Sequence, residues 1–326
     1  MKKYFALLLS LCCLFAFSGC GSKTEVTEKK DDAITIPFSK SLEKYGITGG
    51  ITLPKQPERV VSLTNTPVLV LDALGVHQVA VPDTKILQWP DSLKDAKRIQ
   101  TGMRSNIDLE SILALQPDLV IVGYHAKDTY GKLLEQQKVP VYYVDAGPTV
   151  GYDSVKDMTL LLVDAFGKDT EAGKAIKQRF AALEESMNEV KKENSGKKVM
   201  VLQAMPPRFY LQNENGTVGS MLKLLGFTNV APVQGGSMVM MDQEKSLSYD
   251  PDLIVSVSAM AGDQEQRAVM EKEFADHASY WNHYKAIREH RILYLSKTFA
   301  VSGGLEELDQ LQDLMKRLAA LKEGKA

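Results

Sequence analysis

The sequence predicts an α/β protein built of two Rossmann-like, three-layer lobes that are joined by one long α-helix. Strand-like and helix-like segments alternate over residues 59–145 and again over residues 197–296, which is typical of parallel sheets covered by helices. The segments "QPDLVIVGYH" (116–125) and "DPDLIVSVSAM" (250–260) repeat one local pattern of turn, buried strand and loop. Between them, residues 169–195 carry apolar side chains at helical spacing, which predicts the linking helix.

Residues 1–19 have the parts of a signal peptide. Two lysines precede the apolar stretch "YFALLLSLCCLFAF", which is too short for a typical membrane-spanning helix. The following "FSGC" resembles a bacterial lipobox, so Cys20 is the expected lipidation site; the alternatives are cleavage elsewhere and an uncleaved anchor. We expect residues 20–46 to hold the lipidated cysteine and a flexible tether, of which residues 21–33 are the most polar. Cys12 and Cys13 lie in the signal, so the mature body has no thiol for a disulfide or a metal site.

The first lobe is predicted over residues 47–168. Unbroken apolar runs such as "LVIV" are typical of strands that helices cover on both faces. Strands are expected at "RVVSL" (59–63), "VHQVAVP" (76–82), "PDLVIVG" (117–123) and "VPVYYVD" (139–145), and helices at "PVLVLDALG" (67–75), "DLESILALQ" (108–116), "DTYGKLLEQQ" (128–137) and "YDSVKDMTLLLVDAFG" (152–167).

The linker helix is predicted over residues 169–195, the second lobe over 196–300 and a C-terminal helix over 301–326. Strands are expected at "KKVMVLQAM" (197–205), "DPDLIVSVSA" (250–259) and "RILYLS" (291–296), and helices at "GTVGSMLKLLGF" (216–227) and "QEQRAVMEKEFAD" (264–276).

Several function classes find no support. A net charge of −2 gives no reason to expect a nucleic-acid partner. The mature chain has no cysteine nucleophile, no Gly-x-Ser-x-Gly elbow and no P-loop, so we do not expect an enzyme. The five histidines show no metal-ligand spacing.

Candidate binding residues follow the predicted strands, because ligands of open α/β sheets lie outside the carboxyl ends of the strands. A ligand cleft is therefore expected between the lobes. The candidates of the first lobe are Met103, Arg104, Tyr124 and His125, and those of the second are Arg208, Met238, Met260 and Phe299. Each has a plain alternative reading: the methionines and Phe299 as packing residues, Tyr124 as a stacked ring, and the charged side chains and His125 as solvated loop residues.

The lipobox, the single linker helix and the paired "PDLVIVG" and "PDLIVSV" strands resemble the class III, helical-linker substrate-binding proteins of ATP-driven importers. Within this class the segments "GMRSNIDLESILALQPDLVIV" and "YLQNENGTVGSMLKLLGFTNV" are similar to the Isd-type haem-receptor lipoproteins. The resemblance implies a monomer, lipid-anchored on the extracytoplasmic face of the cell membrane, that has no intrinsic cofactor. It would carry haem to permease and ATPase subunits, with a ferric siderophore or cobalamin as the alternative ligand.

The resemblance also implies roles for single residues. Haem iron would lie between Met103 and Met260, although that second position is a histidine in the Isd-type receptors. Tyr124 and His125 are further haem contacts, and Arg104 and Arg208 would pair with an anionic group. Permease docking normally uses one carboxylate per lobe, but these positions hold Leu69 and Ser220, which leaves Asp72 as the substitute in the first lobe.

Two rival readings remain at the level of sequence. One is a two-lobed tetrapyrrole chelatase-like enzyme, which would need a catalytic base such as His125 in its cleft. The other is a sensor or adhesin module that takes no part in transport.

Overall fold

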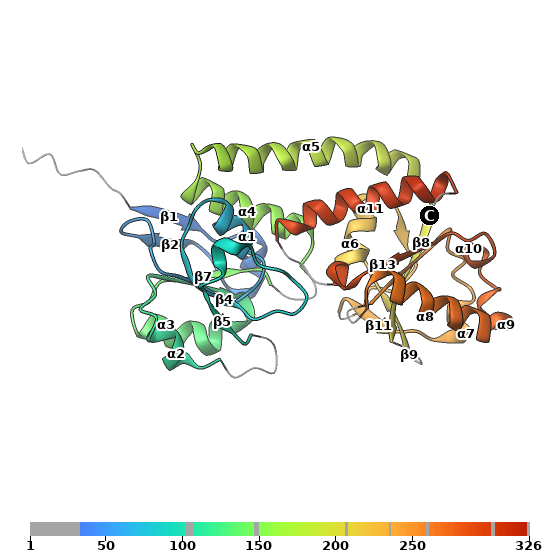
Figure 1. Ribbon diagram of the computed structural model, residues 1–326, viewed down its shortest axis with the longest axis horizontal. Coiled ribbons are helices and arrows are strands. Elements are labelled where there is room, and N and C mark those ends of the chain that lie inside the picture. Colours follow the sequence, from blue (N-terminus) through green and yellow to red (C-terminus); the bar gives the residue numbers. More distant parts are fainter. Residues whose placement is uncertain are drawn as a thin grey trace, which may run out of the picture.

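The computed structural model describes residues 33–101, 107–146, 150–205, 208–234, 236–258, 261–300 and 304–324. Two α/β lobes lie side by side, and the long helix α5 (Glu171–Asn194) runs along one flank of both (Figure 1). This arrangement confirms the predicted fold class of two lobes joined by one long helix. Within the described ranges, no helix is long and apolar enough to cross a membrane.

The sheet of the first lobe is entirely parallel, with the strand order β5-β4-β3-β6-β7. All five residues of the central strand β6 are buried, as its unbroken apolar run predicts. The strands are β3 (Val60–Ser62), β4 (Gln78–Pro82), β5 (Lys97–Ile99), β6 (Leu119–Gly123) and β7 (Val141–Val144).

Mostly short helices cover this sheet. Asp108 caps the N-terminus of α2, where its carboxylate accepts a hydrogen bond from the Glu110 amide at 3.1 Å. The α-helices are α1 (Val68–Ala73), α2 (Leu109–Leu113), α3 (Lys132–Gln136) and α4 (Tyr152–Phe166). The other helical turns are η2 (Asp91–Leu93), η3 (Tyr124–Ala126) and the π-helix η4 (Lys127–Gly131).

The N-terminal segment corrects the predicted tether of residues 20–46. Strand β1 (Ile34–Pro37) pairs antiparallel with β2 (Gly50–Leu53), and the 3-10 helix η1 (Lys40–Tyr45) lies between them. Ile36 and Leu42 are fully buried against the first lobe. Residues 34–46 therefore belong to the folded lobe, because their apolar side chains find partners that lie far along the chain.

The sheet of the second lobe is mixed, in the order β11-β9-β8-β12-β13, with β10 also paired to β8. Strands β8, β12, β13 and β10 are parallel, whereas β9 runs antiparallel to both β8 and β11. The strands are β8 (Lys198–Met205), β9 (Arg208–Gln212), β10 (Thr228–Asn229), β11 (Met238–Met240), β12 (Leu253–Val257) and β13 (Ile292–Leu295).

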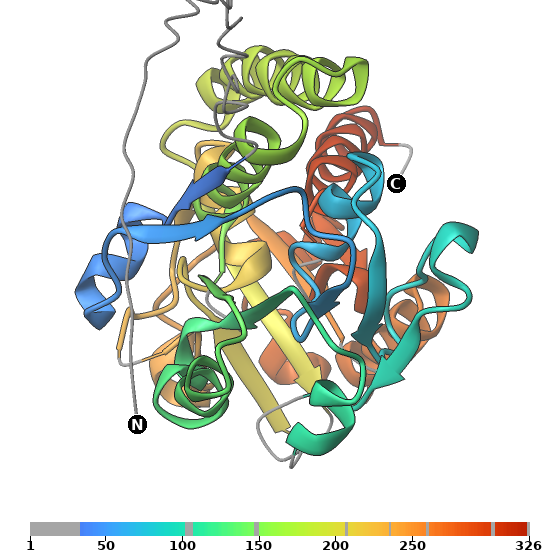
Figure 2. The same ribbon diagram turned by 90° about the vertical axis from the view of Figure 1, so that its left-hand side faces the viewer.

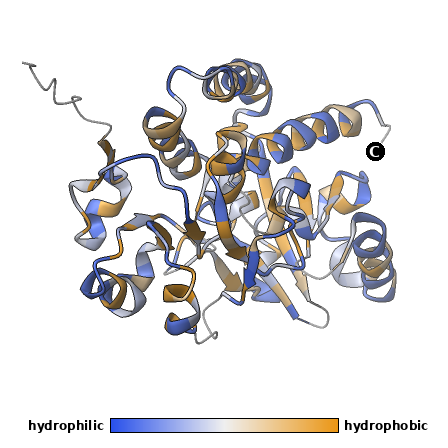
Figure 3. Ribbon diagram, turned by 60° about the vertical axis from the view of Figure 1, so that its left-hand side comes forward, coloured by the Kyte–Doolittle hydropathy of each residue, from blue (hydrophilic) through white to orange (hydrophobic). Residues whose placement is uncertain are grey.

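Helices cover both faces of the second sheet. Trp281 packs edge-on against Phe209 and Phe274 in a core on the face that α8 and α9 cover. The helices are α6 (Thr217–Leu224), α7 (Gln243–Ser246), α8 (Asp263–Asp276), α9 (Ala278–Trp281), α10 (Lys285–Arg288) and η5 (Lys297–Ala300). Figure 3 shows the apolar strands inside and the polar outer faces of the helices.

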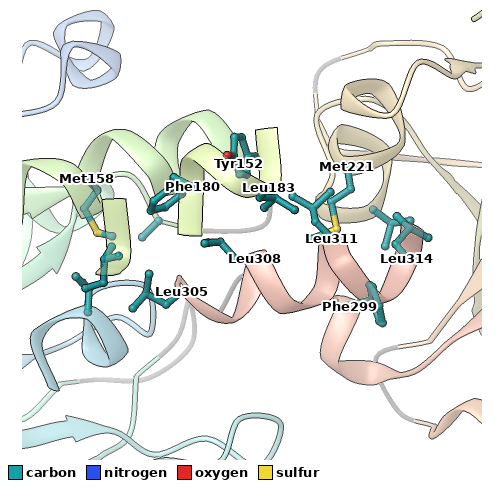
Figure 4. Close-up of a cluster of buried hydrophobic side chains, with 14 of the residues drawn as sticks. Tyr152, Met158, Phe180, Leu183, Met221, Phe299, Leu305, Leu308, Leu311 and Leu314 are labelled. Atoms are coloured by element: carbon teal, nitrogen blue, oxygen red, sulfur yellow. The ribbon is translucent and has the colours of Figure 1, made fainter. Parts of the chain in front are cut away.

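One hydrophobic core continues through both lobes. The C-terminal helix α11 (Glu306–Lys322) lies beside α5, as the end-on view in Figure 2 also shows. Its first turns carry Leu305 and Leu308 toward Met158 and Phe180, while Leu311 and Leu314 lie near Met221 of α6 (Figure 4). The lobes are therefore held by two helices rather than by the linker alone.

Candidate functional site

Loops at the carboxyl edges of the two sheets meet between the lobes. Gly304 follows the last strand of the second lobe, and a Cβ built on it would lie 2.0 Å from the carbonyl oxygen of Thr66, which follows β3. On the flank near α5, a Cβ on Gly151 would lie 3.2 Å from Oγ of Ser220. Strand ends of both lobes thus border one common region, which is where ligands of this fold class bind.

Three aromatic rings gather at the carboxyl edge of the first sheet; we call Tyr45, Tyr124 and His125 the aromatic cluster. The rings of Tyr45 and Tyr124 are stacked, with centroids 3.8 Å apart and planes inclined by 10°. His125 meets Tyr124 edge-on at 5.7 Å, and its imidazole lies against Gly123, where a Cβ would come within 2.5 Å of it. Tyr124 and His125 lie at this sheet edge, and Tyr45 joins them from the N-terminal segment.

The phenol of Tyr124 is held protonated. Hydrogen bonding with Tyr45, followed by burial, raises the pKa of Tyr124 to about 12. The nearby carboxylate of Asp145, which accepts a hydrogen bond from Ser154 at 2.9 Å, acts in the same direction. The ammonium of Lys44 lies 4.9 Å from the centre of the Tyr45 ring. The Tyr124 hydroxyl is therefore a hydrogen-bond donor at neutral pH.

A second group lies on one face of the antiparallel edge of the second sheet; we call Arg208, Tyr210, Met238 and Met240 the edge face. Arg208 and Tyr210 alternate on β9, so they share a face, and Met240 and Met238 stand opposite Tyr210 and Gln212. Met238 is 41% exposed and Met240 is 71% exposed. A strand row of large, unburied thioethers is unusual, because burial would stabilise such side chains.

The edge face lies at the carboxyl edge of the second sheet. Strand β11 is antiparallel to β9 and therefore parallel to β8, so Met240 lies near the carboxyl edge of the sheet, as Arg208 does. Arg208 and Met240 border a pocket of about 150 Å³ together with Phe209, Met241 and Trp281. Among the described residues, no acidic side chain pairs with the exposed Arg208 guanidinium.

Other predicted residues lie elsewhere. Met103, Arg104, Met260 and Cys20 fall outside the described residues. The predicted ligand contact Phe299 is corrected by its surroundings: its side chain is only 3% exposed and packs in the core that α11 shares with α6. The turn of η5 directs this ring inward, so it cannot reach a ligand without opening the core.

The positions considered for permease docking differ in their surroundings. Asp72 is half-buried on α1, and its carboxylate accepts a hydrogen bond from Ser92 at 2.7 Å. Leu69 packs against the core, and Ser220 donates to the carbonyl oxygen of Thr217 at 2.8 Å beside Gly151. Of these three, only Asp72 presents a carboxylate at the surface.

The described residues hold no group of three or more histidine, cysteine or acidic side chains that could bind a metal ion. Sequence reasoning missed Tyr45 and Tyr210. The alternation in "RFYLQ" is the signal that predicts a strand with Arg208 and Tyr210 on one face. What the two groups share is a set of flat or polarizable side chains with positive charge at the margin.

Comparison with known proteins places these features in context. The family model for periplasmic binding protein matches residues 60–298. The high-affinity heme uptake system protein IsdE of Staphylococcus aureus is 24% identical over 263 residues, which cover 78% of this chain and 86% of that protein. An ABC transporter substrate-binding lipoprotein of Bacillus subtilis, YvrC, is 22% identical over 318 residues, which cover 95% of this chain and 94% of that one.

Solved structures share the fold. The periplasmic catecholate-siderophore binding protein VctP of Vibrio cholerae matches with a TM-score of 0.67 at 20% identity, covering 87% of this chain and 99% of that chain. IsdE of S. aureus complexed with heme matches with a TM-score of 0.60 at 20% identity, covering 79% and 97%. The vitamin B12 binding protein BtuF of V. cholerae matches with a TM-score of 0.57 at 16% identity, covering 80% and 97%.

Proposed function

We propose that this chain, which belongs to the periplasmic binding protein family, captures haem outside the cytoplasm and delivers it to an ABC importer. Family membership bears out the resemblance to substrate-binding proteins that the sequence segments indicate. The identity of the ligand as haem is the more specific part of the proposal. It is supported by the name of the relative IsdE and by the chemistry of the edge face and the aromatic cluster.

The observation that carries the haem proposal is the edge face. Haem is a flat apolar ring with two carboxylates on one side. Met238, Met240 and Tyr210 offer polarizable and aromatic surface for such a ring. The guanidinium of Arg208, which pairs with no acidic side chain among the described residues, suits a carboxylate. These features suit a large apolar ring better than a sugar or a naked metal ion. The aromatic cluster gives a comparable surface on the first lobe.

Further residue roles complete this proposal. Met103 and Met260 are the proposed axial ligands of the haem iron, with Tyr124 and His125 next in order, and Arg104 is a further anion contact. Cys20 carries the lipid that holds the protein on the outer face of the membrane, which is supported by the relative YvrC, named as a lipoprotein. Asp72 contacts the permease, whose ATPase subunit drives import, and the binding protein acts as a monomer.

A second candidate ligand is a ferric siderophore or a corrinoid. Arg208 favours it, because an exposed arginine pairs equally well with a catecholate oxygen or another anionic group. In that case the ligand surrounds its own metal, and no side chain of this chain coordinates it. A chelatase-like activity is not proposed, because the family is one of binding proteins and the exposed His125 is the one base offered by the aromatic cluster.

Haem titration followed by absorbance tests the proposal, with the signal region removed. We expect a saturable Soret shift, a changed spectrum in Met103→Ala and Met260→Ala, and about tenfold or greater weakening in Arg208→Gln. Arg267→Gln on α8 is the matched control, since its ion pair with Glu271 lies on an exposed helix. A saturable shift that both methionine variants leave unchanged would move coordination to Tyr124 or His125. No saturable shift would end the haem reading and favour a siderophore or corrinoid.

A further inference from the structure

A small cavity lies at the carboxyl edge of the second sheet, where β9 begins and β11 ends, on the side of the lobe away from α5 (Figure 1). Its volume is about 150 Å³, and its lining consists of Arg208, Phe209, Met240, Met241, Gln243 and Trp281. Pockets that hold a whole drug-sized ligand measure about 300–1,000 Å³. The cavity is therefore too small for the ring system of haem, and its size suits one short side arm of a larger ligand.

The inner wall of the cavity is apolar and closely packed. Phe209 is 7% exposed and Met241 is 9% exposed. Trp281 is 1% exposed and meets the Phe209 ring edge-on, with centroids 5.5 Å apart. Its indole nitrogen donates to a carboxylate oxygen of Glu273 at 3.1 Å, so this N–H is already used. Polar recognition in the cavity is therefore left to Arg208 and Gln243, the other two polar residues of the lining.

The turn that carries Gln243 is held by buried hydroxyl groups. Gln243 is the first residue of α7, and its carbonyl oxygen accepts hydrogen bonds from the hydroxyls of Ser246 at 2.9 Å and Tyr280 at 3.3 Å. Tyr284 donates to Oγ of Ser246 at 2.9 Å, and both residues are fully buried. The backbone of Gln243 is therefore fixed beside the cavity, and only its exposed side chain has to be ordered when a ligand binds.

The charges of the lining favour an anionic group in the cavity. The lining contains one guanidinium, that of Arg208, and no carboxylate. Two carboxylates on the neighbouring helices have other partners: Asp242 caps α7 by accepting from the Lys245 amide at 3.1 Å, and Glu273 accepts from the Trp281 indole. An anion that enters the cavity would therefore meet a positive charge and an amide, with no acidic side chain in the lining to oppose it.

We propose that Gln243 is a specificity-determining residue, which together with Arg208 holds one carboxylate side arm of the transported ligand in this cavity. The guanidinium and the side-chain amide donate hydrogen bonds to the carboxylate oxygens. The stem of the arm packs against the apolar lining, which includes Met240 and Trp281. This proposal rests on the proposed function and deepens it, because it requires the ligand to carry a carboxylate on a short stem as well as a flat apolar ring.

The cavity then distinguishes between the ligands considered above. Haem carries its two carboxylates on short flexible stems, so one of them can enter while the ring stays outside. The side arms of a corrinoid end mainly in neutral amides, which give the Arg208 guanidinium no charge to balance. The anionic oxygens of a catecholate lie directly on a rigid ring and have no stem. The size and charge of the cavity therefore favour haem.

The test compares haemin with haem dimethyl ester, which lacks the free carboxylates, in absorbance titrations of the mature protein. The variants are Gln243→Leu, which removes the amide at similar volume, and Gln243→Glu, which adds a carboxylate to the lining. Gln178→Leu is the matched control, since Gln178 is an exposed glutamine on α5. Urea unfolding of each variant checks that the fold is retained.

We expect Gln243→Leu to bind haemin about tenfold more weakly and Gln243→Glu more weakly still, with no change for the ester and none in Gln178→Leu. Equal losses for haemin and the ester would indicate a packing effect and would overturn the carboxylate arm. Haemin affinities that both Gln243 variants leave unchanged would also overturn it, while the proposed function stands. If the wild-type protein binds neither probe, the proposed function and this proposal fall together.

Discussion

Replacing Gly304 with alanine is expected to destabilise the folded protein by about 2–5 kcal/mol. Gly304 has a φ of +75°, a left-handed conformation that costs a residue with a Cβ about 1–2 kcal/mol. A Cβ there would also lie 2.0 Å from the carbonyl oxygen of Thr66, closer than the 3.0 Å that real Cβ atoms keep. The two loops would have to separate by about 1 Å, and such overpacking costs roughly 1–3 kcal/mol.

Gly196 provides a matched control, because it has a φ of +85° and no atom within 4 Å of its Cβ position. Gly196→Ala should therefore cost only the backbone part, about 1–2 kcal/mol. Urea unfolding followed by tryptophan fluorescence measures both, since Trp89 reports from the first lobe and Trp281 from the second. Equal losses in the two variants would refute the idea that the Thr66–Gly304 contact fixes the spacing of the lobes.

Three further predictions concern α11 and the aromatic cluster. Leu311→Ala should cost about 2–5 kcal/mol in urea unfolding, because Leu311 is fully buried in the shared core; a loss below 1 kcal/mol would contradict this packing. Burial raises the pKa of Glu306 above its ordinary 4.5, so the stability that this group contributes is present below pH 4.5 and lost as pH rises through the folded-state pKa. Glu306→Gln should thus gain stability over the wild-type protein near pH 7 and lose that advantage toward pH 4, whereas a pH-independent difference would exclude the mechanism. In ultraviolet titration, Tyr45→Phe should lower the pKa of Tyr124 from about 12 toward 10, and an unchanged titration would remove Tyr45 as the cause.

The regular parts of both lobes are predictable from local pattern. Strand β6 is an apolar run, strand β12 is apolar except for Ser256, and every residue in each is buried, because helices cover both faces of these parallel strands. Helix α5 follows from apolar spacing, with Thr170 as the capping residue whose hydroxyl accepts from the Gly173 amide at 3.0 Å. These signals lie within a few residues of one another.

The features that sequence reasoning missed depend on contacts between segments that lie far apart in the chain. The sequence of the segment that contains β1 is typical of a flexible tether. The segment is buried only because β1 pairs with β2, in which Leu53 lies opposite Ile34. Strand β9 reads as a loop because two prolines precede it, although its side chains alternate between buried and unburied positions. Tyr45 could not be assigned to the site for the same reason, since only the fold brings η1 beside Tyr124.

The candidate site is less predictable than the fold. Position after a strand correctly places Tyr124 and His125 at one sheet edge, but it gives no direction for a side chain. Phe299 also follows a strand, yet it turns inward because η5 packs against α6, where Thr217 donates to the carbonyl oxygen of Phe299 at 2.9 Å. Side-chain direction in short turns depends on such tertiary hydrogen bonds.

The shared core has a consequence for how the chain is made. A polypeptide is synthesised from its N-terminus, so the first lobe and α5 are complete before α11 exists. Until α11 arrives, the apolar side chains of Phe180 and Leu183 lack the leucines that cover them in the finished protein. Helix α11 thus completes the shared core. A nascent chain stalled before residue 305 would leave this apolar surface exposed, and chaperones and proteases would be expected to bind it.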